Sequence, residues 1–486
     1  MENYDVAVIG GGLLGCFVAR ELMRYELSAV LIEKREDVCT GISKANTAIV
    51  YPGYDNKPGS LKAELTVRAN AFFTELCREL DAPFTRCGSL MLSYGENADA
   101  VLQRKLDNGR KSGVSGLRLI SGEEALELEP GLRDGISTAL YSESAGVVNP
   151  WQLCYGAYEN AVSNGCHVKL NTELMGIRRD GTGYVLETDG GGLRVRAVVN
   201  CGGLYADRVQ ELLFPPSVRI FPDGADYLVL ERGAAALSHI VLHEPEDGGK
   251  GLTAVPTTDG NLLLGPSERP CAGASTATSA EGLVFVRGLA RELLPGIDTG
   301  RVIRSFAAVR PNPHRVIYRD GDYIPDGGGI GSFVIEDPEP GFIGFIGIKT
   351  PGLTCARELG ALAAERMAAH LGATARPDFD PERKGIRQVR GLDFAAREAL
   401  VHEDKAYGEI LCRCEDISRA EALEAISRGA VTLDGVKRRC GAMMGVCQGS
   451  RCQQEIAELL ADRLGISLSS VTKSGGASFI TGGRHG

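Results

Sequence analysis

Four cysteines near the C-terminus have the types and spacing of a four-thiolate metal site. They form a C-x-C pair and a C-x4-C pair with 32 residues between the pairs: Cys412, Cys414, Cys447 and Cys452. Four thiolates can hold a zinc ion or a [2Fe–2S] cluster. Zinc ribbons more often use C-x2-C pairs, so the C-x-C pair favours iron–sulfur over structural zinc, and both over four unrelated thiols. A cluster would serve as a one-electron acceptor within the chain.

Basic residues and glycines surround the second cysteine pair. The run Lys437, Arg438, Arg439 carries positive charge, and the nearby glycines leave backbone N–H groups accessible. Both features would offset the sulfur-centred negative charge of a cluster. Cys440 lies in the same stretch, and we expect it to be a spare thiol rather than an alternative ligand.

The N-terminal residues have the pattern of a dinucleotide-binding βαβ unit. An apolar strand over 6–9 leads into Gly10-x-Gly12-x-x-Gly15, then a helix, then a second strand that ends at Glu33. The first glycine permits a tight turn, the second lets the backbone approach a pyrophosphate, and the third lets helix and strand pack closely. The pyrophosphate would lie at the helix N-terminus, and Glu33 would accept a hydrogen bond from a ribose hydroxyl. The alternative is a glycine-rich turn in an ordinary βαβ unit.

Composition and charge limit the class of protein. The chain has 486 residues, 43% hydrophobic and 24% charged, which is enough for two or three domains. Its net charge of −10 argues against nonspecific nucleic-acid binding, which needs a basic surface. No apolar run approaches the length of a membrane-spanning helix, and the nucleotide-binding strand begins at once, so we expect no signal peptide. Fourteen cysteines then indicate a reducing cytoplasm, where thiols stay buried or bind a cluster rather than form disulfides.

The elements between the two ends follow the order found in flavoproteins. Apolar periodicity predicts helices over 63–81, 151–164 and 280–293, and strands dominate 217–265. The segment 341–371 has the pattern of a strand, a glycine-rich turn and a long helix, whose N-terminus can face an electron-rich ring carbonyl. The predicted fold class is α/β, and with the family resemblance that these segments carry it becomes a Rossmann-like FAD-binding domain assembled from separated segments, a mixed β-sheet substrate domain and a small helical C-terminal [2Fe–2S] domain.

The linker follows from composition, and the other domain boundaries are those that the family resemblance implies. Residues 373–405 are rich in Pro, Arg, Asp and Glu and lack periodicity, which is typical of a linker. The other expected ranges are 1–80, 146–216 and 336–372 for the FAD-binding domain, 81–145 and 217–335 for the substrate domain, 406–470 for the cluster domain and 471–486 for a tail.

Several segments together carry a family resemblance. The glycine fingerprint, SKANTAIVYPGYDNKPGSLKAEL, VVNCGGLYAD, GKGLTAVPTTDGNLLLGP, SFAAVRPNPH and GIKTPGLTCARELG resemble FAD-dependent oxidoreductases of the D-amino-acid oxidase and glycerol-3-phosphate dehydrogenase superfamily. The tail CRCE…KRRCGAMMGVCQGSRC resembles the bacterioferritin-associated-ferredoxin-like (BFD-like) [2Fe–2S] domain. Together they resemble the large subunit of anaerobic glycerol-3-phosphate dehydrogenases. The resemblance spans almost the whole chain except the linker, and it is more specific for the cofactors than for the substrate.

The resemblance implies where FAD is held. The ADP half would contact the glycine fingerprint and Glu33, the pyrophosphate would border Gly202 and Gly203, and a turn after residue 346 would place backbone donors near the flavin C2 carbonyl. The full set implied for FAD is Gly10, Gly12, Gly15, Glu33, Ser43, Lys44, Asn46 and Thr47 (the last four along the flavin edge), Gly202, Gly203, Gly347, Gly352, Leu353 and Thr354.

The resemblance also implies an anion site for the substrate. Arg310 matches a position that often binds the substrate's anionic group, and a guanidinium binds phosphate or carboxylate through two parallel hydrogen bonds. The alternative for Arg310 is a surface ion pair. Lys349 either supports the same anion or is a solvated turn residue.

Two departures from the family pattern weaken the substrate assignment. Tyr51 stands where many relatives have a histidine, and an unperturbed tyrosine is not a base near neutral pH. Tyr51 would then donate a hydrogen bond or pack over the flavin ring. Asp223 and Gly224 stand where relatives commonly carry two basic residues. His314, in the segment after Arg310, is a candidate base, although a single loop histidine is more often solvated.

The expected activity is an FAD-dependent dehydrogenase that oxidises a small anionic alcohol, with sn-glycerol 3-phosphate the leading candidate. Electrons would pass from FAD to the [2Fe–2S] cluster, and the resemblance implies that they then reach a second redox subunit, carrying flavin or pyridine nucleotide, in a hetero-oligomer. The alternatives are oxidation of a 2-hydroxy acid, an amino acid or an opine-like amine, or a redox-relay subunit with no substrate of its own. The expected location is the cytoplasm, including a peripheral position at the membrane through partners.

Overall fold

The computed structural model describes residues 1–271 and 273–481 and groups the chain into two units. The larger unit comprises residues 1–34 and 38–383, and the smaller comprises residues 35–37 and the chain from Lys384 onward. Each unit has its own hydrophobic core. Within the described part of the chain, no helix combines the length and the apolar character needed to cross a bilayer.

A mixed sheet with parallel central strands carries the N-terminal fingerprint. Its strands run in the order β10 (Leu174–Asp180), β11 (Gly183–Thr188), β12 (Gly191–Asn200), β1 (Glu2–Ile9), β2 (Ala29–Ile32), β9 (His167–Lys169), and β21 (Phe342–Ile346) pairs with β12 and with β20 (Val334–Glu339). β1 is parallel to β12 and β2, and β12 is parallel to β21. The second half of β1 and all of β2 are buried, as expected for strands covered on both faces.

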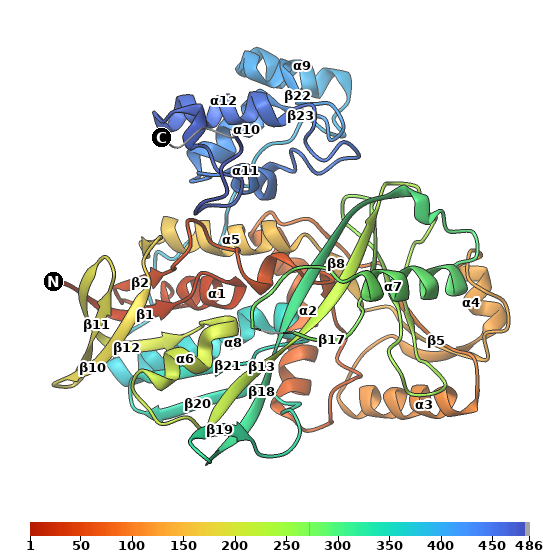
Figure 1. The fold of residues 1–486 in the computed structure, drawn as a ribbon, viewed down its shortest axis with the longest axis horizontal. Helices are drawn as coiled ribbons and strands as arrows, with labels where there is room; N and C mark the ends of the chain where they lie inside the picture. Colours follow the sequence, from red (N-terminus) through yellow and green to blue (C-terminus); the bar gives the residue numbers. More distant parts are fainter. Residues whose placement is uncertain (272, 482–486) are drawn as a thin grey trace. The chain divides into compact units, whose positions relative to one another are not determined.

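Helices cover one face of this sheet. α1 (Leu13–Leu22) packs against α5 (Pro150–Ser163) and α8 (Gly352–Leu371), and α8 also packs against α2 (Leu61–Glu79) (Figure 1). Local signals set the helix starts: the Ser60 side chain caps α2, and the Asn149 side chain caps α5 just before Pro150. These helices are close to the predicted ranges 63–81 and 151–164.

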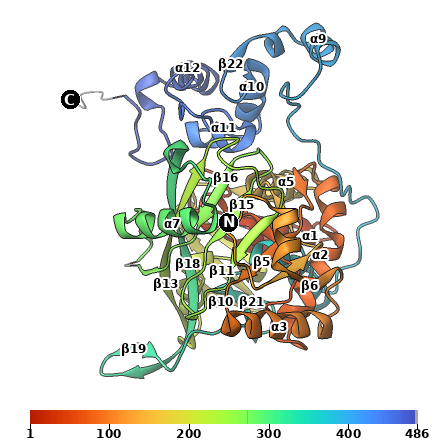
Figure 2. The same ribbon diagram turned by 90° about the vertical axis from the view of Figure 1, so that its right-hand side faces the viewer.

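A second, largely antiparallel sheet also belongs to the larger unit, beside a small three-stranded sheet of β3 (Ile49–Val50), β8 (Gly146–Val148) and β4 (Phe84–Thr85). Its order is β19 (Asp322–Pro325), β18 (Val302–Arg319), β13 (Val218–Leu230), β16 (Leu262–Gly265), β15 (Thr253–Pro256), β14 (Ile240–His243), β5 (Ser89–Ser93), β7 (Thr138–Ser142), β6 (Leu117–Ser121), with β17 (Arg269–Pro270) beside β13. The helices α3 (Glu96–Lys111), α4 (Gly122–Leu128) and α7 (Ala280–Leu293) pack on it. β13 and β18 run side by side over nearly their whole length, and β19 turns back on the far end of β18 (Figure 2).

The segment predicted as a linker is ordered at its start. Arg20 is fully buried in α1 and donates to the carbonyl of Pro381 at 3.1 Å. Asn160 donates to the carbonyls of Asp380 and Glu382, both at 3.0 Å. Residues 373–383 are therefore bound to the larger unit, because buried polar side chains far away in sequence find their partners there.

The smaller unit is helical, with one short hairpin. β22 (Ile410–Cys412) pairs with β23 (Ile417–Ser418), and α10 (Arg419–Ser427), α11 (Leu433–Cys440) and α12 (Gln453–Leu464) pack around a common core. Ser418 and Glu421 form a capping box at the start of α10. The unit also contains α9 (Phe394–Glu403), inside the predicted linker, where the Asp393 side chain caps the helix. The sequence did not predict this helix, because all of its side chains are at least partly exposed and no apolar periodicity marks it.

Candidate active site and cluster site

The glycine-rich segments meet at one edge of the parallel sheet. Ile9 lies beside Asn200, and Asn200 lies beside Gly344, so β1, β12 and β21 all end at this edge. The turns that follow them carry the three groups of glycines assigned to FAD by the resemblance. Carboxyl ends of adjacent parallel strands are where α/β sheets bind nucleotides.

The three glycines of the fingerprint differ in how strongly the surrounding structure excludes a side chain. A Cβ on Gly10 would lie 2.5 Å from the carbonyl oxygen of Cys201, and φ of Gly10 is +105°. A Cβ on Gly15 would lie 1.9 Å from the carbonyl oxygen of Gly10. A Cβ on Gly12 would meet only the Ser43 hydroxyl, at 3.3 Å. Gly10 and Gly15 are thus required by packing, whereas Gly12 leaves space beside the start of α1.

The N-terminus of α1 fits a dinucleotide pyrophosphate. Gly12 is its N-cap residue and supplies no side-chain cap, so the helix presents its positive dipole end. The Leu13 N–H donates to Ser43 Oγ at 2.8 Å, which holds the Ser43 loop beside the turn. Glu33 Oε2 accepts from the Gly11 N–H at 2.6 Å, so the carboxylate also braces the turn. Its predicted bond to a ribose stays a prediction.

The loop predicted to run along the flavin edge is held by the side chain of Asn46 and by that of Trp151 in α5. Asn46 donates to the carbonyl of Ser43 at 2.8 Å and accepts from the Ala48 N–H at 2.7 Å. Trp151 Nε1 donates to the carbonyl of Lys44 at 3.2 Å. Asn46 therefore shapes the loop, and a direct contact between Asn46, Lys44 or Thr47 and FAD stays a prediction.

The turn between β21 and α8 lies next to Tyr51. Gly347 has φ +68°, and a Cβ there would lie 2.7 Å from Pro313. α8 begins at Gly352 without a side-chain cap, so its N–H groups can face an acceptor. Thr354 Oγ1 accepts from the Tyr51 N–H at 3.0 Å. The loop that carries Tyr51 is thus joined to the turn assigned to the flavin C2 carbonyl.

Strand register places Arg310 on the sheet face that carries Tyr227. Arg310 lies opposite Asp223, and Phe306 lies opposite Tyr227. Side chains alternate along a strand, so Arg310 and Asn312 of β18 share this face. The rings of Tyr227 and Phe306 stack with centroids 4.9 Å apart.

Asn312 links Lys349 to this face, and the sequence reasoning missed it. Lys349 Nζ donates to Asn312 Oδ1 at 2.8 Å, and the Asn312 amide donates to the carboxylate of Asp223. The available signal was its spacing, two residues after Arg310 in a strand. Lys349 is a half-buried residue with a defined partner, which differs from a solvated turn residue.

Three cations gather here, and we call Arg310, Lys250 and Lys349 the cation cluster. Burial and then repulsion from Arg310 lower the pKa of Lys250 and of Lys349. The Glu268 carboxylate lies 3.5 Å from Arg310 Nη1 and 3.7 Å from Lys250 Nζ. Asp223, which departs from the family pattern, lies directly across from Arg310 in the register of β13 and β18.

Tyr51 is not arranged as a base. Burial raises its pKa to about 12, an effect that the hydrogen bond to Thr47 opposes. Burial also raises the pKa of Tyr227, although the nearby Arg310 lowers it. Both hydroxyls keep their protons near neutral pH, and the Tyr227 hydroxyl accepts a hydrogen bond from Arg310.

His314 lies in strand β18, not in the loop that the sequence suggested. The proline- and glycine-rich segment around it extends β18 and turns into β19, so it continues the sheet. The His314 ring meets the Phe221 ring edge-on at 5.2 Å. Its Nδ1 is buried and has no hydrogen-bond partner among the described residues.

The four cluster cysteines lie as two pairs in the smaller unit. Cys412 and Cys452 are each 1% exposed and their thiols interact, while Cys414 and Cys447 are half-buried and interact with each other. The contact with Cys452 lowers the pKa of Cys412. Each iron of a [2Fe–2S] cluster takes two thiolates, so two pairs fit this group. Within residues 1–271 and 273–481, no three His, Cys, Asp or Glu side chains converge as ligands for a single metal ion.

Backbone groups point at these sulfurs. The N–H groups of Met443 and Glu415 are directed at Cys412, and those of Gly449 and Arg451 at Cys447. Such N–H groups offset negative charge on a cluster.

The basic run and Cys440 have other surroundings. Arg439 binds both carboxylate oxygens of Asp37 at 2.6 and 2.8 Å, and Arg438 lies 3.4 Å from the same group, all buried. These two arginines, which the sequence suggested would offset the negative charge of the cluster, are instead paired with a carboxylate of the protein. Burial raises the pKa of Cys440 to about 12, and its thiol donates to the carbonyl of Val436, which agrees with the expectation of a spare thiol.

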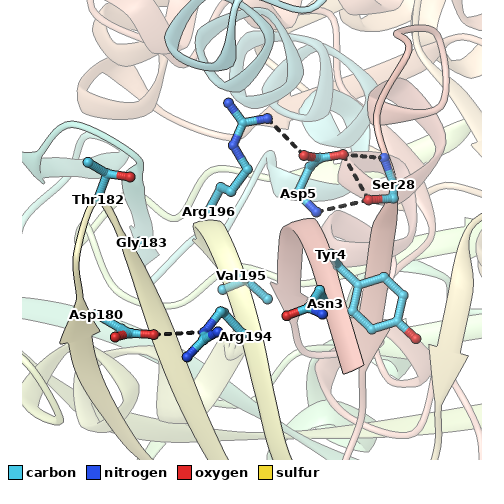
Figure 3. Close-up of a pocket in the computed structure, with 10 residues that line it drawn as sticks. All are labelled: Asn3, Tyr4, Asp5, Ser28, Asp180, Thr182, Gly183, Arg194, Val195 and Arg196. Atoms are coloured by element: carbon cyan, nitrogen blue, oxygen red, sulfur yellow. Dashed lines mark hydrogen bonds and ion pairs between the residues drawn. The ribbon is translucent and has the colours of Figure 1, made fainter. Parts of the chain in front are cut away.

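An open hollow of about 290 Å³ lies away from this chemistry. It is lined by the amino-terminal parts of β1 and β12, at the edge opposite to the glycine turns (Figure 3). Its charged side chains are paired: Arg196 with Asp5 at 2.9 Å and Arg194 with Asp180 at 2.7 Å. The hollow has no unpartnered charge among these residues that would bind a substrate.

Comparison with known proteins assigns the class. The family model "FAD dependent oxidoreductase" matches residues 5–366, and the model "BFD-like [2Fe-2S] binding domain" matches residues 410–462. The chain therefore belongs to the FAD-dependent oxidoreductase family and carries a BFD-like [2Fe–2S] binding domain. Its cofactors are FAD and a [2Fe–2S] cluster.

Particular relatives cover the chain to different extents. It is 36% identical over 487 residues to the glycerol 3-phosphate dehydrogenase of Caloramator mitchellensis, covering 99% of this chain and 98% of that protein. It is 31% identical over 284 residues to the human mitochondrial L-2-hydroxyglutarate dehydrogenase, covering 55% and 61%. Dithionite-reduced L-α-glycerophosphate oxidase from Mycoplasma pneumoniae with FAD bound has a TM-score of 0.70 at 24% identity, covering 79% and 99%, and shows the shared fold.

Proposed function

We propose that this protein is a dehydrogenase that oxidises sn-glycerol 3-phosphate to dihydroxyacetone phosphate. The observation that supports this most is the cation cluster, where burial and the charge of Arg310 lower the pKa of two lysines. Like charges held this close in a partly buried site favour an anionic ligand. The full-length relative, named a glycerol 3-phosphate dehydrogenase, agrees with this substrate.

A phosphate suits the cation cluster better than a carboxylate does. A phosphate group carries about −1.5 to −2 charge at pH 7, so it relieves more of the repulsion among the cations than a single carboxylate. The Arg310 guanidinium can bind two phosphate oxygens in parallel, while Lys250 acts as a point charge.

The chain's own residues would orient the substrate and move its proton. FAD, when bound, accepts a hydride from the substrate carbon, and the cluster carries electrons singly. Arg310 fixes the phosphate and thereby positions the neighbouring carbinol. Tyr51, whose pKa burial raises to about 12, donates a hydrogen bond to the substrate oxygen. Lys349, whose pKa is lowered by burial and by Arg310, takes the hydroxyl proton at Nζ.

We propose Lys349 rather than His314 as the base. The backbone of His314 lies four residues beyond Arg310 on β18, or about 13 Å at a strand rise of about 3.3 Å per residue. Lys349 is hydrogen-bonded to Asn312, only two residues from Arg310.

The BFD-like domain supports a one-electron route out of the enzyme. Electrons would leave FAD for the cluster held by Cys412, Cys414, Cys447 and Cys452, and then pass to a second redox subunit. The fourteen cysteines of the chain support a proposed location in the reducing cytoplasm.

The test is an anaerobic spectroscopic comparison of substrates. The purified protein with both cofactors is mixed with sn-glycerol 3-phosphate, with L-2-hydroxyglutarate or with an amino acid, and the visible absorbance of the flavin is followed. We expect sn-glycerol 3-phosphate to bleach the flavin at the lowest concentration and highest rate. Bleaching by none of these compounds, with normal reduction by dithionite, would favour a relay subunit.

Oxidation of a 2-hydroxy acid is the second candidate. The identity of 31% with an L-2-hydroxyglutarate dehydrogenase favours it, and a carboxylate would then occupy the site at Arg310. Faster bleaching by L-2-hydroxyglutarate than by sn-glycerol 3-phosphate would establish it.

A further inference from the structure

Glu268 occupies an unusual place among the cations. One carboxylate oxygen, Oε1, lies 3.5 Å from Arg310 Nη1, and the other, Oε2, lies 3.7 Å from Lys250 Nζ. The carboxylate therefore bridges two members of the cation cluster. Nothing in the sequence pattern drew attention to it, since its partners are distant in the chain.

The neighbours of Glu268 are fixed to a buried carboxylate. Asp226 is fully buried, its carbonyl accepts from the Ser267 N–H at 3.1 Å, and its Oδ2 accepts from Ser267 Oγ at 3.0 Å. Arg269 Nε donates to the same carboxylate at 3.3 Å. Asp226 thus holds the residues on both sides of Glu268. This arrangement places the Glu268 side chain beside the cation cluster.

Glu268 itself is held loosely. Its side chain is 49% exposed, and both of its distances exceed the roughly 2.7–2.9 Å of charge-assisted hydrogen bonds. An arriving phosphate could make shorter bonds to the same cations. The carboxylate is close enough to compete for them and weakly enough bound to be displaced.

We propose that Glu268 is a resident counter-ion that every anionic ligand must displace from Arg310 and Lys250. This rests on the anion site of the proposed function and adds the residue that sets its affinity. The carboxylate keeps the cations paired between turnovers. It also weakens the hold on inorganic phosphate and on a phosphorylated product, and so favours product release.

The test measures anion binding directly. Inorganic phosphate is titrated into the FAD- and cluster-containing protein in a calorimeter, for the wild type and for Glu268→Gln, which keeps the side-chain shape. Losing two partly exposed ion pairs should tighten phosphate binding by about three- to tenfold. KM for sn-glycerol 3-phosphate should fall by a similar factor, without a rise in kcat.

Two further variants separate the explanations. Glu127→Gln, on the exposed side of α4, changes the net charge equally and should leave phosphate binding unchanged. Glu268→Ala should tighten binding as Glu268→Gln does. Weaker phosphate binding in both Glu268 variants would show that the carboxylate positions Arg310, and unchanged binding would remove it from the site; either result overturns the proposal.

The calorimetric result is independent of the reaction. If the wild type does not oxidise sn-glycerol 3-phosphate but Glu268→Gln tightens phosphate binding, the counter-ion proposal stands and the proposed activity is wrong. If the wild type oxidises it and phosphate binding is unchanged in Glu268→Gln, only the counter-ion proposal is wrong.

Discussion

Replacing Arg310 with methionine removes the central charge of the cation cluster while keeping a long apolar side chain. A charge-assisted, bidentate contact with a phosphate is worth about 2–5 kcal/mol when it is desolvated. The Arg310 side chain is 30% exposed, so solvent screening places the loss in the lower part of this range, about 2–3 kcal/mol. We expect the rate constant of flavin reduction divided by Kd to fall about thirty- to a hundred-and-fifty-fold.

The same substitution should change the pH dependence. The charge of Arg310 helps burial to lower the pKa of Lys349, so its removal lets that pKa rise. A lysine base acts in its unprotonated form, and flavin reduction therefore increases as pH rises through its pKa. In Arg310→Met this increase should move to higher pH.

Anaerobic stopped-flow spectrophotometry of the flavin measures both effects. Arg315→Met is the matched control, because Arg315 is an exposed arginine on the same strand β18 and points to the other face. Arg310→Lys should recover only part of the loss, since a point charge lacks the guanidinium fork. Flavin reduction in Arg310→Met that matches Arg315→Met at every substrate concentration would place the anion site elsewhere.

Four other substitutions test the cofactor sites and Tyr51. Gly12→Val should abolish FAD binding, because the new side chain enters the space beside the start of α1; full flavin occupancy would contradict the nucleotide site. Cys447→Ser should remove most of the iron and leave FAD bound, whereas Cys440→Ser should keep the iron; the reverse pattern in iron analysis would refute the ligand set. Tyr51→Phe should slow flavin reduction by about tenfold, because a hydrogen bond to the substrate oxygen is lost. The pH dependence of the rate should stay unchanged between about pH 6 and 9, since a group with a pKa of about 12 does not titrate there. If the substitution abolished the rise of the rate with pH, Tyr51 would be a base.

The sequence was informative where function depends on local spacing. The glycine fingerprint predicted the β1–α1–β2 unit, and the helix expected over 280–293 is α7 (Ala280–Leu293). A dinucleotide site and a four-thiolate site followed from short motifs, because a turn at a strand end and a set of paired thiols are encoded by neighbouring residues, whereas FAD was implied by the family resemblance.

The rest depended on contacts between residues distant in sequence. Asn312 and Glu268 reach Lys349 and Arg310 only through the register of β13 and β18 and the turn near Asp226. The binding of residues 373–383 depends on polar side chains more than 200 positions away, such as Asn160. Composition shows that such residues are charged or polar, but it does not show which partner they meet.

The central claim is that sn-glycerol 3-phosphate reduces the flavin of this protein. Its direct test is an anaerobic titration of the cofactor-loaded protein, in which flavin bleaching and the dihydroxyacetone phosphate formed are measured in the same samples. The proposed function predicts about one dihydroxyacetone phosphate for each flavin reduced until the cluster also takes up electrons. A flavin that dithionite bleaches fully, but that sn-glycerol 3-phosphate leaves oxidised at every concentration, would contradict it.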